Sequence, residues 1–93
     1  MQLTPKDRED LRSVILGYLA ARNAAAFDAS SIRATLMRRR AVDFPIAEAD
    51  VTSACQFLTD KGLATRLDSD MGSSIFWRAT DQGVVEAERR GLC

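Results

Sequence analysis

The stretch from Phe57 to Leu67, FLTDKGLATRL, changes from one type of secondary structure to another within a few residues. Up to Lys61, apolar residues recur at the spacing of an amphipathic helix. Gly62 follows, and glycine readily adopts the left-handed conformation that ends helices. Beyond it, residues 63–67 alternate between two sides, as in a strand. The chain must therefore contain a helix that leads directly into a strand.

Two helices are predicted before this unit. Thr4 can cap the first one and Pro5 suits its first position, which predicts a helix over residues 5–22. Asp28 or Ser30 can cap the second, which ends near RRRAVDFPI because Pro45 forces the residue before it out of helical geometry. The apolar positions of both helices recur every three or four residues. They are Leu11, Val14, Ile15, Tyr18 and Leu19 in the first helix, and Ala29, Ile32 and Leu36 in the second.

The third helix is predicted from about Ala47 to Lys61, and its two faces differ in character. The inner face is apolar and consists of Ala47, Val51, Ala54, Cys55 and Leu58. The opposite face is mostly polar and consists of Ala49, Thr52, Ser53, Gln56 and Asp60, with Phe57 on the flank.

A hairpin and a last helix complete the chain. Residues 68–74, DSDMGSS, have the composition of a turn, and residues 75–79, IFWRA, are rich in strand formers. Trp77 shares the core side of this strand with Ile75 and Ala79, and Phe76 lies on the other side. Thr80 can cap a helix over residues 81–90 that ends at Gly91. The fold predicted for residues 1–93 is a single domain, mainly α with a small antiparallel β-hairpin, in the order α-α-α-β-β-α.

Three local motifs resemble the winged helix-turn-helix family over about residues 8–91. VTSACQFLTDKGLATRL (51–67) is similar to the family's third helix and the Lys-Gly-Leu run that leads into the first wing strand. WRATDQG (77–83) is similar to the leucine-Thr-x-x-Gly run that closes the second wing strand, with Ala79 where the family has a larger aliphatic residue. FDASSIRATL (27–36) is similar to the second helix. The long first helix and the terminal Thr-x-x-Gly helix also resemble small winged-helix proteins of Mu-like phages.

Composition excludes several other classes of function. The chain has no histidine, so no histidine-based catalysis or Cys/His zinc site is possible. It has no glycine-rich phosphate loop, and its carboxylates are scattered over helix starts and turns. We therefore expect no enzyme, no metal and no cofactor. No signal peptide or apolar run of about 20 residues is present, so a soluble cytoplasmic chain is expected. Its two cysteines, Cys55 and Cys93, are expected to be reduced, with a single disulfide between them as the alternative.

The resemblance implies a transcription regulator that binds double-stranded DNA with the third helix in the major groove and the wing on phosphate. Base contacts are expected from Thr52, Ser53 and Gln56. Phosphate contacts are expected from the basic residues Arg33, Arg38, Arg39, Arg40, Arg66 and Arg78. The arginines near residue 40 have a second interpretation, as a solvated helix end whose cations complement the helix dipole.

The charge count favours an alternative, a winged helix that binds another protein. Thirteen basic and thirteen acidic residues balance to zero, and the third helix carries three acids against one base. An exposed Phe57 or Phe76 would then mark the protein contact. Association of two copies through the first and last helices is also expected from the resemblance, so a homodimer is predicted.

Overall fold

The computed structural model describes residues 3–68 and 74–92 of the chain. The described part contains α1 (Pro5–Ala21), β1 (Phe27–Asp28), α2 (Ala29–Arg39), α3 (Glu48–Asp60), β2 (Ala64–Asp68), β3 (Ile75–Ala79) and α4 (Asp81–Arg89). All six predicted elements are present in the predicted order, which confirms the winged-helix arrangement. The centre of the predicted turn, around Gly72, and the terminal Cys93 lie outside the described residues.

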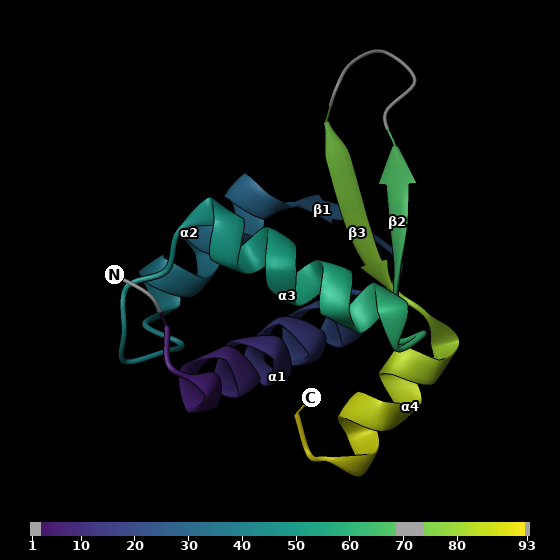
Figure 1. The fold of residues 1–93 in the computed structure, drawn as a ribbon. Helices are drawn as coiled ribbons and strands as arrows, with labels where there is room; N and C mark the ends of the chain where they lie inside the picture. The colour runs from purple at the N-terminus through teal and green to yellow at the C-terminus, as the bar shows by residue number, and fades with distance from the viewer. Residues whose placement is uncertain (1–2, 69–73, 93) are drawn as a thin grey trace.

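The wing is part of a three-stranded antiparallel sheet, where the sequence predicted a two-stranded hairpin. The additional strand, β1, pairs Phe27 with Trp77 and Asp28 with Phe76, so that β3 lies in the middle of the order β1-β3-β2. A strand of two residues is too short to show an alternating pattern. In Figure 1 the β2–β3 hairpin projects beyond the helices, while β1 lies against its base.

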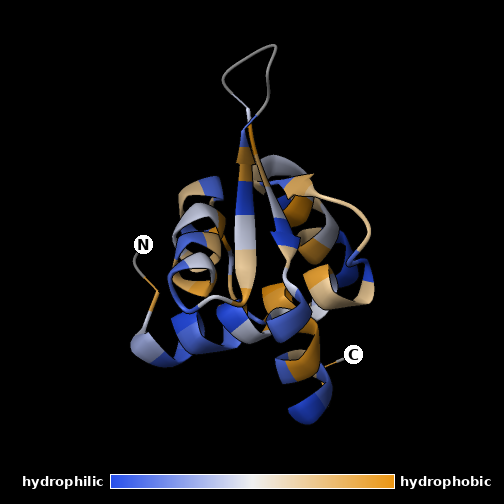
Figure 2. Ribbon diagram, turned by 90° about the vertical axis from the view of Figure 1, so that its right-hand side faces the viewer, coloured by the Kyte–Doolittle hydropathy of each residue, from blue (hydrophilic) through white to orange (hydrophobic). Residues whose placement is uncertain are grey.

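The core lies where α1 packs against α3 and α4 and against the sheet. Trp77, with 2% of its surface exposed, is its largest fully buried side chain. Figure 2 shows apolar residues on the sides of the helices that face one another and polar residues on the outside. The predicted inner face of α3 is buried at Val51, Ala54, Cys55 and Leu58.

One predicted core position differs in the structure, and the packing of β2 shows which of its two sides is buried. Ala47 is exposed because it precedes α3 as its cap, where its N–H donates to the Asp50 carboxylate at 2.9 Å. Leu67 is 38% exposed, because the buried side of β2 is the side of Ala64. Cross-strand partners project to the same side of a sheet, and Ala64 lies opposite the buried Ala79. Leu67 lies opposite Phe76, on the outer side.

The junction between α3 and β2 is tied to the start of α4. Gly62 adopts a φ of 77°, as its place after the helix requires. The Thr80 hydroxyl donates to the Gly62 carbonyl at 2.7 Å and accepts from the Gly83 N–H at 3.0 Å. The Thr80 N–H in turn donates to the Leu63 carbonyl at 3.1 Å. Two of the three motifs that carry the family resemblance, residues 51–67 and 77–83, therefore meet in one contact.

None of the helices in the described ranges is long and apolar enough to cross a membrane.

Candidate nucleic-acid interface

The outer face of α3 is exposed, as the sequence predicted. Thr52, Ser53 and Gln56 are all solvent-accessible and none of them carries a charge. The Gln56 side-chain amide donates to the Asp60 carboxylate at 3.0 Å, one helical turn away. Its amide oxygen accepts no hydrogen bond from the described residues. These side chains can therefore offer donors and acceptors to a ligand that lies along the helix.

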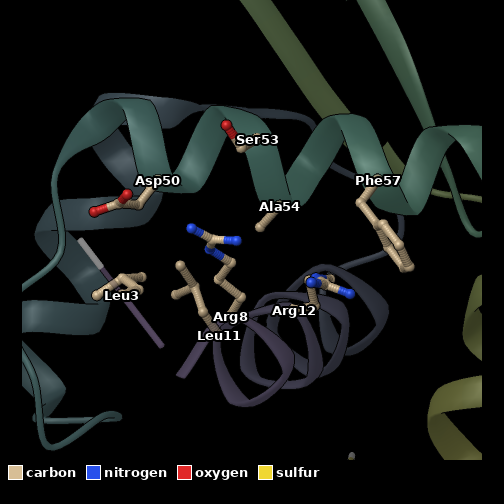
Figure 3. A pocket seen from close by; sticks show the side chains of 8 residues that line it. All are labelled: Leu3, Arg8, Leu11, Arg12, Asp50, Ser53, Ala54 and Phe57. Carbon is tan, nitrogen blue, oxygen red and sulfur yellow. The ribbon is translucent and has the colours of Figure 1, made fainter. Parts of the chain in front are cut away.

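The two flanks of α3 differ in charge. On the flank near α2 and the wing, Thr52 lines a hollow whose charged residues are Asp28 and Glu48. On the other flank, Ser53 lines a hollow of about 400 Å³ between α3 and α1, which contains Arg8 and Arg12. Figure 3 shows both guanidinium groups between the two helices. Cations thus gather beside α3 on the α1 side.

Phe57 connects this hollow to a second one of about 450 Å³ towards α4. The guanidinium carbon of Arg12 lies 4.0 Å from the Phe57 ring centroid, and the Lys61 Nζ lies 5.4 Å from it. The Phe57 side chain is 39% exposed, as the alternative function required. Its ring also lies against two cations, and the position of Phe57 on the flank of the predicted third helix did not indicate this role.

The sequence did not identify Arg8 and Arg12 as site residues. They lie one turn apart on α1, on either side of Leu11 in the sequence, and Leu11 is buried. Helical spacing could have placed them together at the edge of the apolar face of α1. It could not have shown that this edge adjoins α3.

The basic residues at the α4 end of this groove are paired. Arg89 Nη2 lies 2.6 Å from Glu86 Oε1, and Arg90 also forms an ion pair with Glu86. Hydrogen bonds from Arg89 and then Arg90 lower the pKa of the Glu86 carboxyl, and the bond to Glu86 raises the pKa of Arg89. The single carboxylate of Glu86 therefore balances one of the two positive charges of Arg89 and Arg90.

The basic residues predicted on α2 differ in their surroundings. Arg33 is half-buried, and its Nε donates to the Ile46 carbonyl at 2.6 Å, so it holds the loop between α2 and α3. The Arg39 guanidinium carbon lies 5.7 Å from the Tyr18 ring centroid, in a hollow without α3 residues in its lining. Arg38 and Arg40 are exposed, and Arg40 ends α2 with a φ of 52°.

The two wing arginines lie on opposite sides of the sheet. Arg66 pairs across the hairpin with Trp77, and Arg78 pairs with Thr65. Because partners share a side, Arg66 projects on the side of the helical core and Arg78 on the outer side. Arg66 also forms an ion pair of 3.0 Å with Asp68. Phe76 is half-buried on the outer side, next to Leu67.

Cys55 behaves as a small buried apolar residue. It is fully buried in α3, and burial raises the pKa of its thiol to about 12. The thiolate is the reactive form of cysteine, so this side chain is protected from reaction in the folded protein.

The fold is similar to those of bacterial transcription regulators. A transcriptional regulator from Clostridium thermocellum matches with a TM-score of 0.75 at 15% identity, over 98% of this chain and 85% of that one. Bacillus subtilis PadR, solved in complex with operator DNA, matches with a TM-score of 0.71 at 19% identity, over 89% of this chain and 47% of PadR. A variant of Lactococcus lactis ZitR, in apo form, matches with a TM-score of 0.67 at 20% identity, over 92% of this chain.

This chain spans 58% of the length of that ZitR chain. No protein-family model matches the sequence, and no curated protein matches it. At these identities the similarity extends to the architecture of the domain. The chain has the winged-helix fold of these regulators.

Proposed function

We propose that the chain is a DNA-binding regulator of transcription that places α3 in the major groove of duplex DNA. The exposed uncharged stripe of Thr52, Ser53 and Gln56 is the observation that carries this proposal. Glutamine can pair with adenine, and hydroxyl groups of serine and threonine can reach bases or phosphates. The fold that the chain shares with PadR, whose structure contains operator DNA, supports the same placement.

The wing supplies a further contact in this proposal. Arg66 projects on the side of the sheet that faces the helical core, so it can reach a phosphate next to α3 once it leaves Asp68. Arg78 projects on the opposite side and would contact DNA that wraps around the wing. Arg38 and Arg40 are exposed and remain candidate contacts, whereas Arg33 would have to give up its bond to Ile46.

A binding-site selection from random duplex DNA tests the proposal. The wild type should enrich a defined sequence, and Gln56→Ala should relax the preference at one position, with a loss of about 1–3 kcal/mol of discrimination. Gln82→Ala is the matched control, because Gln82 is an exposed glutamine on α4 that lies beside Gly62, beyond the end of α3 and outside the stripe. If Gln56→Ala retains the full preference of the wild type, α3 does not read bases through this residue.

Two finer features belong to the same proposal. A homodimer would present two copies of α3 to half-sites about one helical turn of DNA apart. Analytical ultracentrifugation of the free protein and of the DNA complex measures this directly. Such a regulator would act in the cytoplasm. The similarity to Mu-like phage proteins stays a prediction, since the structural neighbours described above come from bacteria.

A protein-binding module is the second candidate. The outer side of the wing exposes Leu67 next to the half-buried Phe76, and the chain has no net charge. The variant Leu67→Asp should no longer bind a partner protein that covers this pair. Its free energy of unfolding should stay within about 0.5 kcal/mol of the wild type, as for most surface substitutions. Retention of the partner by this variant would exclude the outer side of the wing as its contact.

A further inference from the structure

The charges beside α3 indicate where the backbone of bound DNA would run. The hollow on the flank near α2 has only acidic charged residues in its lining, Asp28 and Glu48, which would repel a phosphate inside it. The two hollows on the opposite flank contain the cations Arg8, Arg12, Lys61, Arg89 and Arg90 against the three acids Glu9, Asp50 and Glu86, so cations are in excess there. A protein without net charge can bind a polyanion only through such a local excess of cations.

We propose that the groove between α1 and α3 holds the sugar-phosphate backbone of the DNA strand that borders α3, with Arg8, Arg12 and Lys61 as its phosphate contacts. This assignment rests on the proposed function. It replaces the arginine cluster at the end of α2 as the main source of phosphate affinity.

The three cations are available for a phosphate. Among residues 3–68 and 74–92, the ion pairs involve Lys6, Arg66, Arg89 and Arg90, and none involves Arg8, Arg12 or Lys61. Asp50 is the acidic side chain in the hollow beside Arg8. Its carboxylate accepts from the Ala47 N–H at the positive end of the α3 dipole, which offsets its charge.

Phe57 organises this set of cations before DNA arrives. The Arg12 guanidinium and the Lys61 ammonium both lie against its ring, at 4.0 and 5.4 Å from the centroid. Side chains that are already ordered lose less entropy when they bind. Arg8 lies one helical turn from Arg12, about 6 Å along α1, so each can reach a different phosphate. In Figure 3 the Arg8 side chain points towards α3 near Asp50 and Ser53.

The test compares two triple variants that remove the same charge. The groove variant combines Arg8→Gln, Arg12→Gln and Lys61→Gln, which removes the three groove cations that form no ion pair within the described residues. The α2 variant combines Arg38→Gln, Arg39→Gln and Arg40→Gln, which removes the arginines at the end of α2. The dissociation constant for one duplex is measured by fluorescence anisotropy from about 50 to about 200 mM salt, since each lost phosphate contact lowers the slope of log K against log salt by about 0.9. Circular dichroism verifies that each variant is folded.

The slope of log K against log salt should be smaller in magnitude by about 2.7 in the groove variant. The ratio of wild-type affinity to variant affinity should therefore fall about 40-fold as salt rises from about 50 to about 200 mM. The variant at the end of α2 should keep the slope of the wild type. A merely structural role for the three groove cations would lower the affinity by the same factor at every salt concentration. An unchanged slope in the groove variant, or an equal loss of slope in the α2 variant, would overturn the groove assignment.

Two single variants keep the proposal testable if the triple variant does not fold. Arg8 is exposed, and Arg8→Gln alone should lower the slope by about 0.9. Phe57→Leu keeps an apolar side chain but removes the ring, so affinity at low salt should fall about two- to five-fold. Failure of the wild type to bind any duplex at low salt would overturn the proposed function itself. Binding by the wild type with no change of slope in Arg8→Gln would overturn the groove alone.

Discussion

Replacement of Gly83 by alanine should destabilise the domain, because α4 starts against the backbone of Leu63. A Cβ at Gly83 would overlap the Leu63 carbonyl oxygen and lie 2.9 Å from its carbon. The carbonyl oxygen would lie 1.9 Å from that Cβ, and Cβ atoms essentially never come closer than 3.0 Å to another heavy atom, so the first turn of α4 would have to move by about 1.1 Å or more. That movement would lengthen the bond of 3.1 Å between the Thr80 N–H and the Leu63 carbonyl.

The size of the effect follows from opposing contributions. Overpacking costs about 1–3 kcal/mol, and a weakened backbone hydrogen bond adds up to about 1 kcal/mol. The better helix propensity of alanine returns at most about 1 kcal/mol. We expect a net loss of about 2 kcal/mol, which for a domain of this size lowers Tm by roughly 8–16 °C.

Urea unfolding followed by far-UV circular dichroism measures this loss, with two glycine variants as controls. Gly91→Ala meets no atom within 4 Å and reports the cost of the left-handed φ of 71° alone, about 1 kcal/mol. In Gly17→Ala the new Cβ meets the Leu92 carbonyl oxygen at 2.7 Å, a milder overlap than the one at Gly83, so a smaller loss of stability is expected. If Gly83→Ala is as stable as the wild type, α4 does not approach Leu63 in this way.

Three further predictions concern single residues. Trp77→Ala should cost about 3–5 kcal/mol in urea unfolding, because it empties the centre of the core, and a loss below about 1 kcal/mol would contradict that position. Arg33→Gln should lower the free energy of unfolding by about 1 kcal/mol, because the bond to the Ile46 carbonyl is lost. It should leave the salt dependence of DNA binding unchanged, and a reduced slope of log K against log salt would instead identify Arg33 as a phosphate contact. Burial raises the pKa of the Cys55 thiol from 9.0 to about 12, and between these values only the unfolded chain releases the proton, so stability falls as pH rises. The advantage of the wild type over Cys55→Ala in free energy of unfolding should shrink across this interval, and a constant difference would show that the thiol is not shielded.

The sequence predicted the helices and their faces because apolar spacing and caps are local signals. The bounds of α3 differ from the prediction by one residue at each end, and its exposed face is the predicted one. The strand β1 escaped prediction because two residues carry no periodicity, and its existence depends on pairing with β3. Local alternation gave the sides of β2 correctly, but only packing shows which side is buried.

The candidate site was predictable only in part for the same reason. The exposure of Thr52, Ser53 and Gln56 follows from helical periodicity. Helical periodicity does not predict the groove between α1 and α3, because Arg8 and Phe57 come from elements far apart in the sequence. The arginines near residue 40 are contiguous in the sequence, yet Arg39 lies near the Tyr18 ring of α1 and Arg40 follows α2 with a positive φ.

The most direct test of this account is the affinity of the wild type for random-sequence duplex DNA at about 50 and about 200 mM salt. With three phosphate contacts in the groove and one on the wing, the slope of log K against log salt should be at least about 3.6 in magnitude, a loss of affinity of about 150-fold over this range. Absence of binding at the lower salt concentration, or binding with a slope near zero, would contradict a DNA-binding role for this winged helix.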